Sequence, residues 1–328
     1  MSTLQEQLQS LKNKQNNYDK EHKTFNEQLE LLKSRGLIIS NDEYALTKLQ
    51  HINYYRLSAY FLPFQYPKKS KYKNQFLPNT TFEDIIKLYY FDTELRKIIF
   101  EAIESIEIYF RTTIAYYHAK EYGSYGYLEQ DTFRVSEEFF YKILGYLQEE
   151  KNRSEEAFIE HFKKEYNTTD LPIWTVVEVI SFGTLSKMYT ILKTKEQKIV
   201  IEKLTGINND VFKNWLHALS VVRNICAHHS RLWNKTLGVS FEVPKKITCF
   251  KAIKNPICSL KTKEELDNPL NNKVFFALSV IEYLLSCIGE DEVGFKEKIK
   301  QLLHKYPQTD KKAMGFVDDW EELEMWSL

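Results

Sequence analysis

The stretch NNDVFKNWLHALSVVRNICAHHSRLWN, residues 208–234, decides how the rest of the chain is organised. It opens with the helix-capping residue Asn208, and apolar residues then recur at helical spacing. These residues are Phe212, Trp215, Leu216, Leu219 and Val222. At about 100° per residue, Arg223 falls in the middle of the same apolar face. Because a buried, unpaired arginine is strongly destabilising, we expect either a polar cleft along this face or a carboxylate that pairs with Arg223.

The composition predicts an all-α protein. The 328 residues include 21 Tyr and 21 Phe, which is enough apolar surface for a large core, but only 10 Gly and 8 Pro. Long stretches of the chain have a helical period. The formal net charge is zero, so a general affinity for polyanions is not implied and any nucleic-acid surface must be local.

Cysteine usage and hydropathy predict a cytoplasmic protein. The four cysteines, at positions 226, 249, 258 and 287, form no CxxC pair, and we interpret them as reduced thiols. The N-terminus is polar and lacks the apolar core of a signal peptide. The longest apolar run, residues 274–288, is interrupted by Glu282 and is too short to cross a bilayer. We therefore expect no association with membranes.

Three parts of the chain can be distinguished. Residues 1–80 predict an N-terminal helical module rich in tyrosine and lysine, and residues 81–240 predict a helical core. Residues 241–328 form a small extension, which we expect to be partly irregular. It combines a basic insertion over 242–263, two helices near 272–288 and 291–305, and an acidic tail that we expect to be loosely packed.

Tyrosines and basic residues alternate within the N-terminal part. Tyr54, Tyr55 and Arg56 begin one segment, and the loop at 66–73 adds Tyr72 and four lysines without an acid. The lysines are Lys68, Lys69, Lys71 and Lys73. Cations between aromatic rings suit a surface that follows an RNA backbone and stacks bases. An ordinary solvated loop explains the same residues equally well.

Acidic residues on two earlier helices are candidate partners for Arg223. A helix expected from Thr80 to about Lys120 carries a polar stripe beside its apolar face. The stripe consists of Glu104, Glu107, Arg111 and His118. It forms either a solvated row of salt bridges or the support for Arg223. Glu178 lies within an apolar octet, residues 173–180, where a carboxylate needs a cation or a hydrogen bond.

The residue types at 223–231 suit the cleavage of a phosphodiester. Histidine transfers protons near neutral pH, and the planar fork of an arginine matches phosphate oxygens. His228 or His229 could act on the 2′-hydroxyl or on the leaving 5′-oxygen of RNA, while Arg223 stabilises charge on the phosphate. Asn224 could position either group, and Arg231 adds a second cation. We expect no metal and no cofactor.

Helix geometry restricts this hypothesis. In a straight helix, residues 223 and 228 point about 140° apart. The helix must therefore end or bend around Cys226–His228, or the two side chains must serve a site shared by two copies. Three other interpretations compete: zinc bound by Cys226, His228 and His229; a Cys–His nucleophilic pair; and structural histidines at a helix end beside a buried Arg–Glu pair.

Four blocks of the sequence, taken together, resemble the Abi-like abortive-infection proteins (the AbiD/AbiF group) of the HEPN superfamily. The central block is Arg223–Asn234, whose Arg-Asn-x-x-x-His spacing resembles the HEPN motif at His228. The others are residues 52–60, 104–111 and 171–183. The resemblance covers roughly residues 25–240, and His229 would also satisfy the motif at a longer spacing.

The resemblance implies a HEPN-like helical bundle and metal-independent RNA cleavage that leaves a 2′,3′-cyclic phosphate and a 5′-hydroxyl. It implies a homodimeric bacterial toxin that acts against phage, controlled by a bound structured non-coding RNA. In this hypothesis Arg223, His228 and Asn224 are catalytic. The supporting candidates are His229, Arg231, Glu104, Glu107, Arg111 and Glu178. The alternative is a non-catalytic RNA-binding or scaffold protein of the same fold.

Overall fold

The computed structural model describes residues 21–166, 168, 170–193, 195–254 and 270–327. Within these ranges the regular elements are helices, and the β pairing consists of isolated bridges without a strand. The prediction of an all-α fold is therefore confirmed. The chain divides into two compact units, Met1–Tyr89 and Tyr90–Leu328.

The first unit is built from short helices with polar caps. They are α2 (Phe25–Ser34), α3 (Asp42–His51), α4 (Tyr54–Ser58) and the 3-10 helix η1 (Leu62–Phe64). Thr24 and Glu27 form a reciprocal capping box at the start of α2, and Gly36 adopts a φ of +84° just after its end. Helix α2 therefore ends just before a left-handed glycine, and residues 1–20 lie outside the described ranges.

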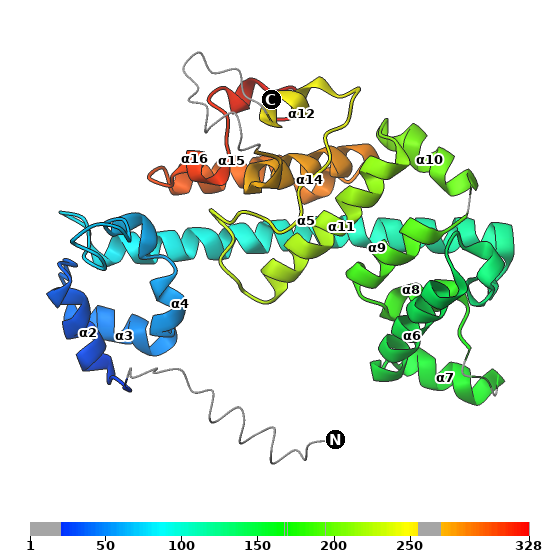
Figure 1. Cartoon of the computed structure of the whole chain (residues 1–328), viewed down its shortest axis with the longest axis horizontal. Helices are drawn as coiled ribbons and strands as arrows, with labels where there is room; N and C mark the ends of the chain where they lie inside the picture. Colours follow the sequence, from blue (N-terminus) through cyan, green and yellow to red (C-terminus); the bar gives the residue numbers. More distant parts are fainter. Residues whose placement is uncertain (1–20, 167, 169, 194, 255–269, 328) are drawn as a thin grey trace. The chain divides into compact units, whose positions relative to one another are not determined.

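The second unit is organised along the long helix α5 (Phe82–Tyr122), most of which belongs to it (Figure 1). The helices that follow are α6 (Glu137–Arg153), α7 (Ala157–Tyr166), α8 (Ile173–Val179), α9 (Phe182–Ile191), α10 (Lys195–Thr205), α11 (Asn209–Ala227), α12 (Thr248–Lys254), α14 (Val274–Ile288), α15 (Phe295–Lys305) and α16 (Lys311–Met314). Short 3-10 helices lie between them at Gly126–Leu128, Gln130–Thr132, Leu270–Asn272 and Asp291–Val293, and another follows α16 at Trp320–Glu322.

Aromatic packing fixes α11 against its neighbours. Phe212 of α11 lies 4.7 Å from Phe110 of α5 and 5.2 Å from Tyr189 of α9, measured between ring centroids. All three side chains are fully buried. Burying one such side chain contributes about 1.5–3 kcal/mol, so this cluster sets how α11 lies against α5. It thereby places Arg223, three turns after Phe212, at the surface of α5.

The C-terminal part is more regular than the sequence suggested. Residues 248–254 of the basic insertion form α12, with Phe250 buried against Trp215, because its apolar residues are spaced for a helix. The expectation of a loosely packed acidic tail is wrong. Trp320 and Trp326 are buried around Phe275 of α14, and the Trp326 indole donates to Ser279 Oγ at 3.0 Å. Burial of the indole rings therefore holds this segment against the core although it is rich in acidic residues.

Candidate functional site

Helix α11 ends at the residue before the two histidines. His228 is the C-cap, and His229 adopts a left-handed φ of +54°. The backbone N–H of Ser230 donates to Ile225 and that of His229 donates to Cys226, each at 3.0 Å, which is the Schellman pattern. Histidine is among the few non-glycine residues that are enriched in this conformation. Of the alternatives that helix geometry left open, the helix does end around Cys226–His228, and both imidazoles are exposed.

A buried ion pair on α5 holds the segment after the histidines. Asp92 is fully buried, forms an ion pair with Arg96, and accepts the backbone N–H groups of Leu232 and Trp233 at 3.1 and 2.7 Å. Arg96 also donates to the carbonyl of Ser230 at 3.4 Å. A buried carboxylate needs such partners. Because they lie on both sides of Arg231, the pair fixes the course of the chain beyond His229.

This pair was not predicted, although the sequence contains a signal for it. Asp92 and Arg96 are spaced i, i+4, which usually marks a solvated surface pair. However, Asp92 lies between Leu88 and Leu95, and all three share the apolar face of α5. An acid at such a position predicts a buried partner.

Arg223 meets a carboxylate of α5, which is one of the two outcomes expected from its position. Its Nε lies 3.5 Å from Glu107 Oε2, and the Arg223 side chain is 30% exposed. The other carboxylate oxygen of Glu107 accepts from Arg111, which also donates to the backbone carbonyl of Val177 on α8. Glu107 and Arg111 are both buried. One buried carboxylate therefore lies between two guanidinium groups and orients the more exposed one.

A small hollow lies beside Arg223. It has a volume of about 150 Å³ and is lined by Phe100, Glu104, Glu107, Ile108, Arg111 and Arg223. The guanidinium carbon of Arg223 lies 5.9 Å from the centroid of the Phe100 ring, within the range of a cation–π interaction. The hollow thus combines a polar floor, which is the Glu107–Arg111 pair, with apolar walls and an exposed acid, Glu104.

The remaining site candidates lie in different surroundings. Asn224 is exposed, and its side-chain oxygen accepts from Arg223 at 3.5 Å. Arg231 is half-buried. Within the described ranges, no hydrogen bond or ion pair joins the side chains of Arg223 and His228. The structure therefore brings Arg223, Asn224, Glu104, Glu107 and Arg111 together, and both histidines lie exposed at the end of α11.

The expectation that Glu178 is a buried carboxylate is wrong. Glu178 is exposed on α8 and its charge remains in water, so it needs no cation. Its neighbours Val176 and Val177 are buried, and the carbonyl of Val177 accepts from Arg111. Helix α8 therefore contacts Arg111 through a backbone carbonyl and not through the side chain of Glu178. A short helix made mostly of apolar residues can still expose one side to solvent. The sequence alone did not reveal that Glu178 lies on that side.

A thiol nucleophile does not fit this geometry. Cys226 is buried, and this burial raises the pKa of its thiol to about 12, so the thiolate is not populated near neutral pH. Among the described residues, no three His, Cys, Asp or Glu side chains are grouped so that they could hold a metal ion.

His118 is fully buried, and desolvation lowers its pKa to about 4, so this imidazole stays neutral in the core.

The tyrosine- and lysine-rich residues of the first unit lie mostly at its surface. Tyr55 is 86% exposed, and Arg56 is also exposed. The expected RNA-binding residue Tyr54 is half-buried instead, because its ring packs against Phe61 and its hydroxyl accepts from Arg35 at 3.0 Å. The Tyr54 side chain therefore stabilises the packing of the first unit and presents little of its ring for stacking with a base.

The loop at 66–73 is anchored at its base. The backbone N–H of Tyr66 donates to Gln75 at 3.1 Å, and the rings of Tyr66 and Tyr72 lie 5.3 Å apart. Lys71 Nζ lies 4.9 Å from the Tyr72 ring centroid. The four lysines of this loop are Lys68, Lys69, Lys71 and Lys73, and all are exposed. The loop therefore presents cations around an aromatic pair in which Tyr72 is exposed and Tyr66 is half-buried.

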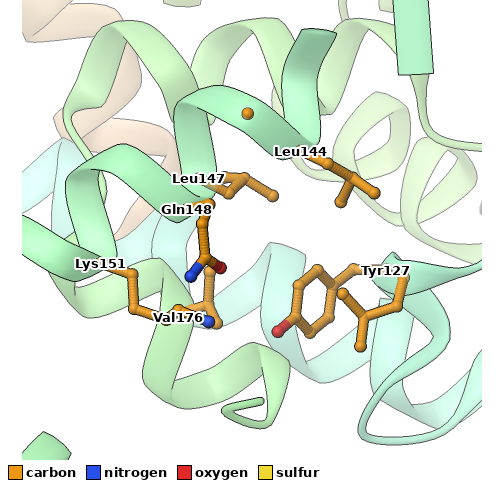
Figure 2. A pocket seen from close by; sticks show the side chains of 8 residues that line it. Tyr127, Leu144, Leu147, Gln148, Lys151 and Val176 are labelled. Atoms are coloured by element: carbon orange, nitrogen blue, oxygen red, sulfur yellow. The ribbon is translucent and has the colours of Figure 1, made fainter. Parts of the chain in front are cut away.

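A second, mostly apolar hollow lies between α6 and α8 (Figure 2). It has a volume of about 290 Å³ and is lined by Tyr127, Leu128, Leu144, Gly145, Leu147, Gln148, Lys151 and Val176. Gln148 and Lys151 bring their polar ends to the side of Val176. Val176, which lines this hollow, is followed on α8 by Val177, whose backbone carbonyl accepts from Arg111.

The chain belongs to the Abi-like protein family, whose model matches residues 47–234. The matched segment ends with the Arg223–Asn234 block and includes α5, α8 and α11. Membership suggests a role in abortive infection. Searches of curated proteins and of solved structures found no match. None of the helices in the described segments is long and apolar enough to cross a membrane.

Proposed function

We propose that the protein is a metal-independent endoribonuclease, a toxin of a bacterial abortive-infection or toxin–antitoxin system with a HEPN-type site. One observation carries this proposal. Helix α11 presents an arginine that a buried carboxylate orients, and it ends at an exposed histidine. An oriented guanidinium and an accessible imidazole are the groups that RNA cleavage through the 2′-hydroxyl requires.

Each residue has a distinct role in this proposal. His228 takes the proton of the 2′-hydroxyl or gives a proton to the leaving 5′-oxygen. Attack of the 2′-oxygen on phosphorus breaks the bond to the 5′-oxygen and leaves a 2′,3′-cyclic phosphate and a 5′-hydroxyl. Arg223 stabilises the charge that develops on the phosphate oxygens. Glu107 and Arg111 position Arg223, and Asn224 positions Arg223 or the substrate.

The site is proposed to be shared between two copies of the chain in the bacterial cytoplasm. Arg223 turns toward α5, whereas His228 lies open at the end of α11. A homodimer would place the histidine of one copy near the arginine of the other. The exposed lysines and tyrosines of the first unit would bind RNA, including a structured non-coding RNA that controls the toxin.

RNA cleavage in EDTA tests the proposed chemistry. We expect the wild type to cleave RNA in EDTA with 2′,3′-cyclic phosphate ends, and His228→Ala to lose this activity. His217→Ala is the matched control, because His217 is exposed on the same helix. His229→Asn keeps the left-handed turn, which asparagine tolerates, and asks whether His229 takes part. Equal cleavage by the wild type and His228→Ala would refute the assignment, and loss of wild-type cleavage in EDTA would refute the metal-free mechanism.

A non-catalytic RNA-binding or scaffold function is the second candidate, and the exposed lysine loop favours it. It predicts that an intact, specific RNA co-purifies with the protein and survives prolonged incubation. Replacing Lys68, Lys69, Lys71 and Lys73 with glutamine should weaken binding and flatten its dependence on salt. Unchanged affinity in that variant would exclude the loop as the binding surface.

A further inference from the structure

The exposed carboxylate in the hollow beside Arg223 has no role in the proposed chemistry. Both oxygens of Glu107 already face an arginine, Arg111 on one side and Arg223 on the other. Glu104 lies one turn earlier on α5, is exposed, and lines the same hollow. In the described part of the chain, no hydrogen bond or ion pair engages its side chain. An acceptor for a ligand is therefore available beside the proposed catalytic arginine.

Apolar side chains stand on both sides of this acid. Phe100 and Ile108 are one turn before and one turn after Glu104, line the same hollow, and are 37% and 56% exposed. Exposed apolar faces that flank a hydrogen-bond acceptor suit a flat heterocycle, which stacks on rings, aliphatic groups and guanidinium planes and bonds through its edge.

The size of the hollow limits what can enter it. Its volume is about 150 Å³. A cavity of about this volume accommodates benzene in another protein, so one six-membered ring fits here. The pyrimidine ring of a base can enter edge first, while the sugar and phosphate remain outside near Arg223. This arrangement fits an unstacked base in single-stranded RNA, whose Watson–Crick edge is free.

We propose that this hollow recognises a guanine next to the scissile phosphate and that Glu104 is the residue that selects it. The inference rests on the proposed ribonuclease function and names the base that the site prefers. A carboxylate offers two acceptors side by side, and guanine presents two adjacent donors, N1–H and the N2 amine. Adenine and cytosine each place a ring acceptor beside their amine, and uracil has one donor between two carbonyls. These three bases therefore oppose a carboxylate with at least one acceptor.

Cleavage of matched oligoribonucleotides tests this specificity. Unstructured substrates that differ in one position, guanine, inosine, adenine, cytosine or uracil, are compared by kcat/KM in EDTA. The wild type should cleave next to guanine about 10- to 100-fold faster than next to the other three standard bases. Inosine lacks the N2 amine and should lose most of the advantage. Glu104→Gln should reduce the ratio of guanine to adenine cleavage toward one, because an amide offers only one acceptor.

Glu101→Gln is the control for this variant. Glu101 is exposed on the same helix, but its carboxylate pairs with Lys298 at 2.8 Å and it does not line the hollow. Its base preference should equal that of the wild type. A wild type that cleaves all four bases alike would overturn the inference and leave the ribonuclease proposal standing. The same holds if Glu104→Gln keeps the guanine preference.

Binding separates failure of the inference from failure of the proposed function. His228→Ala, with and without Glu104→Gln, is titrated with the guanine and inosine oligonucleotides and followed by fluorescence polarisation. A guanine preference that depends on Glu104 supports the base site even if the wild type cleaves no RNA. No preference in binding, together with loss of the dimer mass in Ile108→Glu, would reassign the hollow to contact between copies and overturn the inference.

Discussion

Two acid–arginine pairs on α5 hold the two parts of the candidate site, and they do so in different ways. Asp92 and Arg96 contact backbone groups of residues 230–233. Glu107 and Arg111 contact one side chain, that of Arg223, together with the carbonyl of Val177. Both pairs are spaced i, i+4 and both are buried. The second pair, Glu107 and Arg111, lines the hollow beside Arg223.

The difference separates stability from chemistry. The backbone-holding pair fixes where the chain runs after α11, so its loss should mainly lower the free energy of unfolding. The side-chain-holding pair fixes how one guanidinium points, so its loss should mainly slow the reaction. Stability and RNA cleavage, measured on the same variants, therefore test whether the two pairs differ in this way.

The largest effect on stability is expected from Asp92→Ala. It leaves Arg96 buried without its carboxylate and two backbone N–H groups without an acceptor, so we expect a loss of about 3–5 kcal/mol. Urea unfolding measures this loss. The exposed pair of Glu101 provides the control, and Glu101→Gln should stay within about 1 kcal/mol of the wild type. Equal stability of the two variants would contradict the role given to Asp92.

His118 is also buried on α5, but unlike the two ion pairs it is kept neutral. Burial lowers its pKa from 6.5 to about 4. Below pH 6.5 the unfolded chain binds a proton that the folded chain does not bind until about pH 4. The free energy of unfolding is therefore not reduced by His118 above pH 6.5. It falls by roughly 3 kcal/mol as the pH falls toward 4. The free energy of unfolding, measured from pH 7 to 4.5, should depend less on pH in His118→Phe. An unchanged slope would show that His118 is not its source.

Glu107→Gln is expected to slow RNA cleavage much more than it lowers stability. The amide keeps a hydrogen-bond acceptor but loses the charge between Arg111 and Arg223, so we expect a loss of about 1–3 kcal/mol in stability. Misplacement of Arg223 should slow RNA cleavage about 100-fold. Single-turnover rates at saturating protein measure this effect on folded enzyme. If cleavage falls only as far as the folded fraction does, Glu107 is a structural residue and the comparison fails.

The smallest effect is expected at Cys226. Its thiol is buried with a pKa of about 12, so iodoacetamide at pH 8 should leave it unmodified in the native protein and modify it in urea. Peptide mass spectrometry distinguishes the two states. Cys226→Ala should retain RNA cleavage, and a complete loss of activity without a loss of folding would revive the Cys–His interpretation.

Much of the arrangement around α11 could be predicted from the sequence, because periodicity and capping act locally. The spacing of its apolar residues and the cap at Asn208 predicted the helix, and the position of Arg223 predicted a carboxylate partner. Which carboxylate it would be depended on how α5 lies against α11. That arrangement is set by Phe110 and Phe212, which are about a hundred residues apart in sequence.

Other features were not predicted because the local composition of a segment does not show how its side chains pack in the folded protein. The tail around Trp320 and Trp326 is acidic, yet its indoles are buried against Phe275. Glu178 was expected inside the core, but a short helix exposes one side, and tertiary contacts decide which. Asp92 was overlooked because an acid four residues before an arginine normally marks a solvent-facing pair.

Subunit complementation tests the central claim, that Arg223 of one copy and His228 of another form one ribonuclease site. Arg223→Ala and His228→Ala chains carrying different tags are co-expressed, purified through both tags, and assayed for RNA cleavage in EDTA. A mixed dimer retains one of two shared sites, so we predict about half of the wild-type activity, while each parent homodimer is inactive. A mixed dimer as inactive as its parents, beside an active wild type, would contradict the shared site.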